Sequence, residues 1–187
     1  KESYMFHTPN IKFTKLQAKS MDLPLLTKIT EGKKESELND LKILIQTAVS
    51  KYNIEGVVTG ALSSVYQATR VQKICSQLGL WCFNPIWQMD QVKLLNELNE
   101  NKFQTLIVGV FAYPLDESYL GKEITKDMID KLIELDKKYK INPAGEGGEL
   151  ETFVINSPMF KKKIIIKKSE IEYKNNSGIL SIKEATL

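Results

Sequence analysis

The apolar residues of this chain alternate between short continuous runs and stretches in which they recur every three or four residues. Continuous runs are typical of buried strands, and the wider spacing places one apolar stripe on a helix. Leu38, Leu41 and Ile45 begin such a stripe, whereas Phe103–Ala112 is the longest apolar run. Strands that alternate with helices through short connections predict the α/β class with a parallel, doubly wound, Rossmann-like sheet. The expected strands lie at 3–7, 24–30, 54–59, 80–83 and 103–112, and the expected helices lie at 10–21 with Asn10 as the cap, from 36 onward, at 63–78 and at 90–99.

A different pattern follows residue 115, and we expect it to form a smaller C-terminal α+β subdomain. A helix is predicted at 125–138, and strands are predicted at 152–156, 163–167 and 179–183. The sequence Asn-Asn-Ser-Gly at 175–178 is typical of a hairpin turn between the last two strands. The predicted domains are therefore 1–115, which carries the parallel sheet, and 116–187.

Composition excludes several classes of protein. Hydrophobic residues make up 42% and charged residues 26% of the 187 residues, as in an ordinary globular protein. The two cysteines and one histidine cannot assemble a zinc site or a disulfide framework. No apolar run would span a bilayer and no secretory signal opens the chain, so we expect a cytoplasmic protein with no membrane partner. The net charge of +3 gives no reason to expect a nucleic-acid partner.

The most unusual segment is Asn142–Thr152, NPAGEGGELET. Its glycines Gly145, Gly147 and Gly148 permit backbone torsions closed to other residues and allow a ligand to approach the main chain. The mutual repulsion of its three carboxylates favours a compensating cation, such as Mg²⁺, an ammonium ion or a cationic substrate group. A solvated acidic turn leading into a strand is the alternative. The three carboxylates are Glu146, Glu149 and Glu151.

A second candidate lies where the strand 54–59 meets the next helix. Gly60, Ala61 and Ser63 precede the helix, whose free N–H groups suit a phosphate, although Ser63 or Ser64 could simply cap it. Ligands of doubly wound sheets bind beyond the carboxyl ends of the strands. Further along the same helix, Tyr66, Gln67 and Arg70 share one face. Arg70 is the only arginine of the chain, and its guanidinium offers a rigid fork for a carboxylate or phosphate.

Three other features have an ordinary structural interpretation. Trp87 could form an aromatic wall for a cationic ligand, but core packing is the commoner role of such a residue. His7 ends the first predicted strand and could act as a base or as a hydrogen-bonded structural group. The lysine run at 161–168 could contact an acidic partner, but lysines are also common on edge strands, where they prevent aggregation.

Several segments together resemble the diphthine–ammonia ligase family of archaea and eukaryotes. They are, in order, SYMFHTPN at 3–10, TGALSSVYQATRVQKICSQLGL at 59–80, the NPIWQMD that follows, LDESYLGKEI at 115–124 and NPAGEGGELETFV at 142–154. These matches span nearly the whole chain, and the GEGGE-x-ET segment is the most specific of them. The family belongs to the N-type ATP pyrophosphatases, which have a HUP-like sheet and a small C-terminal subdomain.

The resemblance implies a reaction and roles for the candidate residues. ATP activates the carboxylate of diphthine on translation elongation factor 2 as an acyl-adenylate, and ammonia displaces AMP to give diphthamide. It implies ATP and Mg²⁺ as cofactors, with ATP near Met5, Phe6, His7 and the 60–63 loop. Glu146, Glu149 and Glu151 would act on the ammonium ion or hold the trimethylammonium group of diphthine. The residues expected to contact the substrate are Tyr66, Gln67, Arg70, Trp87, Gly145, Gly147, Gly148 and Thr152.

One element of the family pattern is missing from the sequence. The family begins with a strand and a Ser-Gly-Gly-Lys-Asp-Ser loop that grips pyrophosphate, and no such sequence occurs in residues 1–187. We expect roughly 30 or more residues of that first βα unit to be absent, judging by its usual size. The first interpretation is a ligase whose full-length chain supplies this loop. Two alternatives to it stay open. One is a non-catalytic module that binds nucleotide or elongation factor, and the other is a different adenylating enzyme, such as one that modifies tRNA.

Overall fold

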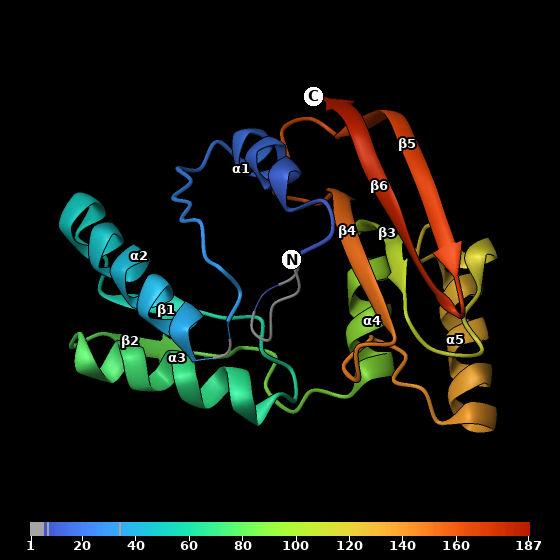
Figure 1. The fold of residues 1–187 in the computed structure, drawn as a ribbon, viewed down its shortest axis with the longest axis horizontal. Coiled ribbons are helices and arrows are strands. Elements are labelled where there is room, and N and C mark those ends of the chain that lie inside the picture. Colours follow the sequence, from blue (N-terminus) through green and yellow to red (C-terminus); the bar gives the residue numbers. More distant parts are fainter. Residues whose placement is uncertain (1–5, 7, 34) are drawn as a thin grey trace. The chain divides into compact units, whose positions relative to one another are not determined.

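The chain forms two compact units, and each unit is assembled from two separate segments of the sequence. The computed structural model describes Phe6 and residues 8–33 and 35–187 (Figure 1). Most of the first unit is Leu25–Met89, and the second unit combines Pro9–Pro24 with Asp90–Leu187. The break at Met89 comes before the predicted boundary at 115/116, because the strand at 104–110 pairs within the second unit.

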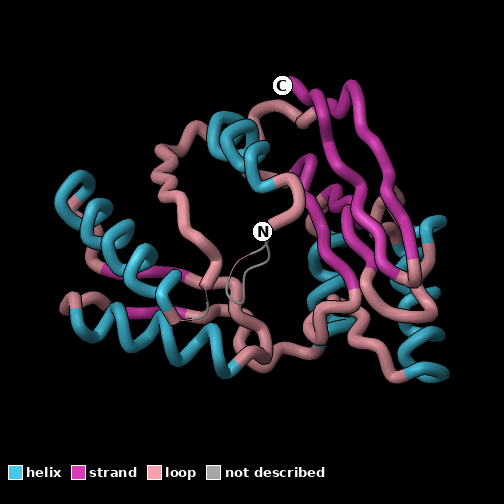
Figure 2. The backbone as a smooth tube through the Cα atoms, in the orientation of Figure 1, coloured by secondary structure: helices cyan, strands magenta, loops and turns pink. Residues whose placement is uncertain are grey.

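The first unit contains a parallel strand pair and two helices. Strand β1 (Gly56–Val58) pairs with β2 (Trp81–Phe83) in parallel, with Gly56 opposite Trp81. The Trp81 ring lies across Gly56, where a Cβ would come within 2.0 Å of it, so this crossing requires glycine. Among its described residues this unit also contains helices α2 (Ser36–Tyr52) and α3 (Val65–Gln77), and helices are drawn cyan in Figure 2.

These elements confirm the predicted α/β class with a Rossmann-like parallel part, and they correct one strand. Helix α3 begins after Ser64, whose hydroxyl caps the Gln67 N–H, and ends just before Gly79. The segment 24–30 was predicted as a strand, but the structure contains no strand there. Its exposed residues explain the error, because Ile29 is 97% exposed and no ladder partner covers the run. The predicted strand at 3–7 lies outside the described residues, except for Phe6.

The second unit is built on a four-stranded antiparallel sheet with the order β4-β3-β6-β5. Strand β3 runs antiparallel to both β4 and β6, so the prediction that 103–112 joins a parallel sheet is wrong. The continuous apolar run was correctly read as a buried strand, but burial on two faces does not distinguish parallel from antiparallel pairing. The strands are β3 (Gln104–Val110), β4 (Leu150–Asn156), β5 (Ile165–Lys174) and β6 (Ser177–Thr186).

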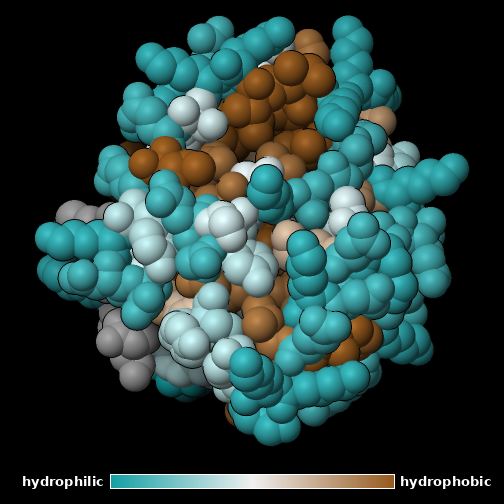
Figure 3. Space-filling view, turned by 90° about the vertical axis from the view of Figure 1, so that its right-hand side faces the viewer, coloured by the Kyte–Doolittle hydropathy of each residue, from teal (hydrophilic) through white to brown (hydrophobic). Residues whose placement is uncertain are grey.

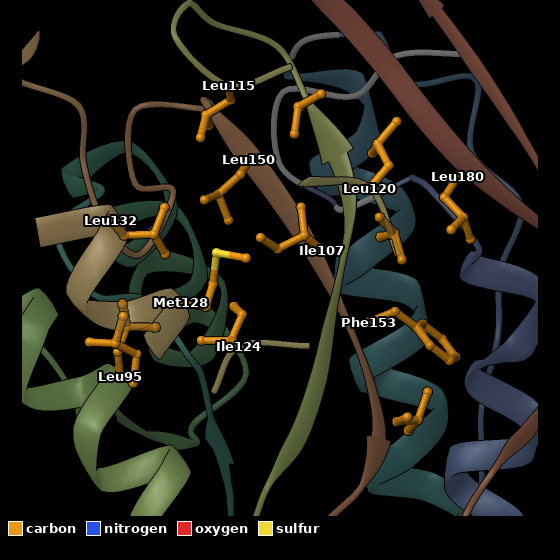
Figure 4. Packing of buried hydrophobic residues seen from close by; sticks show 14 of the residues in the cluster. Leu95, Ile107, Leu115, Leu120, Ile124, Met128, Leu132, Leu150, Phe153 and Leu180 are labelled. Carbon is orange, nitrogen blue, oxygen red and sulfur yellow. The ribbon is translucent and has the colours of Figure 1, made fainter. Parts of the chain in front are cut away.

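Both faces of β3 are packed. Helices α4 (Gln91–Glu100) and α5 (Lys126–Tyr139) contribute Leu95, Met128 and Leu132 on the side toward which Ile107 points (Figure 4). Leu120, Phe153 and Leu180 lie on the other side of the strand. Because Ile107 is fully buried, a polar residue at this position would cost the unit several kcal/mol, of the order seen for unsatisfied buried groups. A short helix η2 (Glu117–Tyr119) follows β3.

The last two strands form the predicted hairpin. Asn175 and Asn176 have φ of 53° and 59°, as the two central residues of a type I′ turn require, and Lys174 pairs with Ser177. Strand β5 is an edge strand, which supports the structural interpretation of its lysines. Figure 3 faces this side of the second unit and shows hydrophilic residues broken by apolar areas. Ile165 and Ile171 are the exposed large apolar residues of β5.

The N-terminal segment of the second unit is attached to the sheet by side chains. Helix η1 (Ile11–Phe13) and helix α1 (Thr14–Met21) follow Asn10, whose side chain makes no cap hydrogen bond. Instead, the Asn10 amide donates to the Leu180 carbonyl at 2.9 Å and accepts from the Ile182 N–H at 2.7 Å. Asn10 therefore holds the expected N-cap position, but its side chain does not cap the helix, because these two backbone groups of β6 lie within reach. The hydroxyl of Ser20, which is buried, bonds Lys162.

No helix among the described residues is both long and apolar enough to cross a membrane.

We expect Asn10→Gly to lower the free energy of unfolding by about 1–3 kcal/mol, because two backbone groups of β6 lose their partner. Glycine is the informative replacement, since Asn10 has a φ of 60° and glycine accepts that torsion without strain. Asn10→Asp keeps the acceptor for Ile182 and should lose less. Urea unfolding measures all three proteins, and equal stability of Asn10→Gly and the parent would contradict this attachment.

Candidate functional site

The candidate residues form two groups, which belong to different units. The first lies at the carboxyl ends of β1 and β2. There the Thr59 hydroxyl bonds the Asn84 side chain, and the Thr59 N–H donates to the Phe83 carbonyl at 3.0 Å. The two loops that follow the strands also meet, because the Gln88 N–H donates to the Leu62 carbonyl at 2.7 Å. The strand ends thus carry two joined polar loops, as the rule for ligand sites in such sheets anticipates.

The 60–63 loop leaves one open approach to its backbone. Among the residues that the structure describes, no atom lies within 4 Å of a Cβ built on Gly60, whereas Ala61 is buried and its N–H faces the Thr59 hydroxyl at 3.4 Å. Ser63 is exposed, and the cap of α3 is Ser64. Phe6 is half-buried. The predicted contacts of Met5 and His7 lie outside the described residues.

Arg70 meets a carboxylate of its own chain. Its Nε and one terminal nitrogen donate to Oε1 of Glu35 at 2.9 and 2.6 Å, and its guanidinium carbon lies 3.6 Å from the centre of the Tyr66 ring. The Tyr66 hydroxyl donates to the same Glu35 oxygen at 3.2 Å. Tyr66 and Arg70 therefore come together as predicted, with Glu35 as a third member that the sequence pattern did not reveal. Gln67 uses its backbone N–H for the Ser64 cap.

A groove of about 360 Å³ lies beside this trio, between α2 and α3. Lys42 and Lys73 line it with Arg70, against the single carboxylate of Glu35. The excess of positive charge suits an anionic group, and the planar guanidinium is the one donor there that binds a carboxylate or phosphate in a fixed geometry.

The second group is the carboxylate loop, which we define as Asn142–Glu151. Gly145 and Gly148 have φ of 80° and 82°, which is the left-handed region that glycine accepts without cost. The loop closes on itself through two turns, since the Gly145 N–H donates to the Asn142 carbonyl and the Gly148 N–H donates to the Gly145 carbonyl, both at 2.9 Å. The carboxylate loop is therefore a double turn held by its own backbone hydrogen bonds.

Glu149 is fully engaged within the carboxylate loop. Its Oε1 accepts from the backbone N–H of Asn142 at 3.0 Å and from the Asn142 side-chain amide at 2.7 Å. Its Oε2 accepts from the Gly147 N–H at 2.9 Å. Glu149 was predicted to be catalytic, and in this structure its carboxylate bridges the two ends of the double turn.

The neighbouring carboxylates occupy different positions. Glu146 is half-buried at the tip, and Glu151 is half-buried on β4, opposite Gly109 of β3. Thr152 follows on the same strand and lines a small cavity of about 150 Å³, whose other walls include Leu94, Leu95 and Leu98 of α4. The strand pairing thus fixes the C-terminal end of the loop, because the N–H of Phe111, which directly follows β3, donates to the Glu149 carbonyl at 2.8 Å.

Trp87 is 36% exposed and belongs to the first unit. The expectation that it packs in a core is therefore wrong, and a role as an aromatic wall for a ligand is compatible with its exposure. Proline at 85 and the turn at 85–88 place it on a surface loop.

No group of three or more His, Cys, Asp or Glu side chains within the described residues could hold a metal ion.

Two site residues were not predicted from sequence, namely Gln91 and Glu35. Gln91 follows the N-cap of α4, and its side chain bonds the carboxylate loop. Glu35 precedes α2 with a φ of 66°. Neither residue stands in a recognisable motif, so only the folded chain reveals that both contact candidate site residues.

The parallel strand ends and the ordered carboxylate loop define a class of protein, an α/β protein with a parallel strand pair in one unit and an acidic glycine loop in the other. Comparison with known families agrees: residues 1–82 match the diphthamide synthase N-terminal domain, and residues 90–187 match the diphthamide synthase C-terminal domain. The chain belongs to the diphthamide synthase family.

The chain is also similar in sequence to several diphthine–ammonia ligases. The chain is 37% identical over 182 residues to the diphthine–ammonia ligases of Homo sapiens and Bos taurus, which covers 91% of this chain and 68% of each relative. It is 34% identical over 194 residues to the diphthine–ammonia ligase of Schizosaccharomyces pombe, which covers 97% of this chain. The chain spans about a third of that yeast protein, 32% of its length.

Glu35 should control the ionisation of Tyr66. Burial raises the pKa of the Tyr66 hydroxyl above its ordinary value, and the hydrogen bond to Glu35 and the charge of Glu35 raise it further, against the opposing effect of Arg70. Glu35→Gln should therefore shift the pKa of Tyr66 downward, because a neutral amide no longer repels the phenolate while Arg70 still attracts it. Ultraviolet titration of the phenolate, with Tyr66→Phe to identify the signal, measures the shift. An unchanged or raised pKa would contradict the trio.

Proposed function

We propose that this chain is the part of a diphthine–ammonia ligase that amidates diphthine on translation elongation factor 2. ATP is the co-substrate and converts the diphthine carboxylate to an acyl-adenylate, with release of pyrophosphate. Ammonia then attacks the acyl carbon, AMP leaves and the amide of diphthamide results. The observation that carries the proposal is the ordered carboxylate loop in a member of this family.

The nucleotide is assigned to the strand ends of the first unit. Gly60 has open space where a side chain would stand, so a ligand could approach its backbone closely. We assign adenine to the neighbourhood of Met5, Phe6 and His7, and the ribose or phosphates to the 60–63 loop. Mg²⁺ would arrive on the phosphates, and it would supply charge neutralisation to the leaving pyrophosphate.

The acceptor is assigned to the carboxylate loop. Diphthine carries a trimethylammonium group, and ammonia reaches a protein at neutral pH mainly as ammonium. Carboxylates suit both cations, and one of them can take the proton that ammonium must lose before it becomes a nucleophile. The ordered turn supports this assignment because it presents Glu146 and Glu151 from a fixed frame rather than from a mobile tip.

Arg70 is assigned to an anionic group of the substrates. Its guanidinium already binds the carboxylate of Glu35, so a substrate carboxylate or phosphate would take the place of an existing partner. The flat stacking on Tyr66 keeps the guanidinium oriented during such an exchange.

We expect Glu146→Gln or Glu151→Gln in the full-length natural protein to lower diphthine amidation by about 10²-fold or more if that carboxylate acts as the base. The dissociation constant of ATP should stay unchanged, because the nucleotide is assigned to other residues. Amidation is followed by mass spectrometry of elongation factor 2, and ATP binding by calorimetry. The matched control is Glu170→Gln, which removes an exposed carboxylate of β5.

Unchanged amidation in both variants would make the carboxylate loop a structural turn. Loss of ATP binding with an intact fold would instead place these carboxylates on Mg²⁺. If the full-length protein binds ATP and elongation factor 2 but forms no amide, it is a binding module. Release of AMP that depends on tRNA rather than on diphthine would identify a tRNA-modifying enzyme.

Arg70→Lys should lower amidation substantially and leave the melting temperature almost unchanged. Lysine keeps the charge but cannot donate two hydrogen bonds in one plane, and surface ion pairs contribute little to stability. Initial rates at saturating ATP and ammonium measure the effect, with Lys73→Arg in the same groove as a charge-preserving control. If Arg70→Lys kept the full rate of amidation, the planar geometry of the guanidinium would not be the reason for an arginine at this position.

A further inference from the structure

A chain of amide groups links helix α4 to the carboxylate loop. The Gln91 side chain uses both ends, since its Nε2 donates to Oδ1 of Asn142 at 2.9 Å and its Oε1 accepts from the Ala144 N–H at 3.0 Å. The Asn142 side chain also uses both ends, because its Nδ2 donates to Oε1 of Glu149 at 2.7 Å. Asn142 therefore connects the Gln91 side chain to the Glu149 carboxylate.

The direction of these hydrogen bonds allows only one orientation of the Asn142 side-chain amide. The Gln91 N–H group requires an acceptor, so the Asn142 amide must turn its oxygen toward Gln91 and its nitrogen toward Glu149. If the Asn142 amide were reversed, its oxygen would face the Glu149 carboxylate, and two acceptors would repel each other. Gln91 and Glu149 therefore favour the same orientation of the Asn142 amide, and Gln91 reinforces the one that the carboxylate requires.

The carboxylate in turn holds the loop. Glu149 accepts three N–H donors, two from Asn142 and one from Gly147, and these residues lie at opposite ends of the double turn. The fit is close, since a Cβ on Gly147 would come within 2.5 Å of Oε1 of Glu149 and 2.6 Å of Nδ2 of Asn142. Hydrogen bonds to a charged acceptor are stronger than neutral ones, so this carboxylate is the strongest acceptor in the network.

We propose that Gln91 and Asn142 are positioning residues of the acceptor site and that Glu149 is their anchor rather than the group that takes a proton from ammonium. The proposal rests on the function proposed above and refines its three carboxylates. Glu149 fixes the loop, and the proton transfer falls to Glu146 or Glu151. Gln91 lies outside the segments that the sequence identified as functional, whereas Asn142 begins the glycine- and glutamate-rich segment Asn142–Thr152.

The first test needs no reaction. In the full-length protein, Gln91→Ala should speed hydrogen exchange of the Gly147 amide by about tenfold, although Gln91 does not touch Gly147. The effect travels through Asn142 and Glu149, so Asn142→Ala should produce it as well. Exchange is read by NMR at single amides. The matched control is Gln104→Ala, which removes an amide bonded to Glu123 and Asn156 in the same unit.

The second test uses amidation. Gln91→Ala and Glu149→Gln should each raise the KM for the diphthine-bearing protein about tenfold, because a loosened loop must be reordered on binding. The double variant should lose much less than the product of the single effects, since both act on one network. Glu149→Gln should keep the pH dependence of kcat, whereas replacement of the true base abolishes its acidic limb.

These outcomes separate the two proposals. If the parent protein forms no amide, the proposed function fails, but the exchange of Gly147 still tests the network. Amidation with unchanged Gly147 exchange in Gln91→Ala would overturn the positioning role. A lost acidic limb in Glu149→Gln would overturn the anchor role, and additive single effects would show that Gln91 and Glu149 act independently.

Discussion

The antiparallel pairing of β3 with β4 is the constraint on which the second unit depends. It places Val110 opposite Leu150, and the next N–H along the chain, that of Phe111, donates to the Glu149 carbonyl. The carboxylate loop therefore enters the sheet at a defined register rather than hanging from it. A slip of one residue would exchange the two faces of β4, so the apolar core that includes Phe153 and Ile155 also fixes Glu151.

Local patterns predicted most elements, and long-range pairing explains the errors. Helices at 63–78, 90–99 and 125–138 were predicted within a few residues, because Ser64, Asp90 and Thr125 cap them through their own side chains. The pairing direction of β3 was missed, since a strand buried on two faces has the same sequence pattern in either arrangement.

The residues of the candidate sites also fall into two groups, those that a local sequence pattern reveals and those that only the fold reveals. The carboxylate loop could be found from sequence because glycines and glutamates are dense there, and the pairing of Tyr66 with Arg70 followed from helical spacing. The partners of these residues could not be found. Glu35 and Gln91 reach the site from other elements, and a side chain that acts across the fold leaves no local spacing to detect.

The attachment of Pro9–Pro24 to the second unit has a consequence for synthesis of the chain on the ribosome. Leu25–Met89 is an insertion between two parts of one folding unit, and it contains all of β1, β2, α2 and α3. Domains generally fold in the order in which they emerge, but here the earlier segment waits for partners made much later. Asn10 finds its backbone partners only when β6 has emerged, so the second unit cannot close before residues 177–186 are made, whereas the strands and helices of Leu25–Met89 emerge earlier.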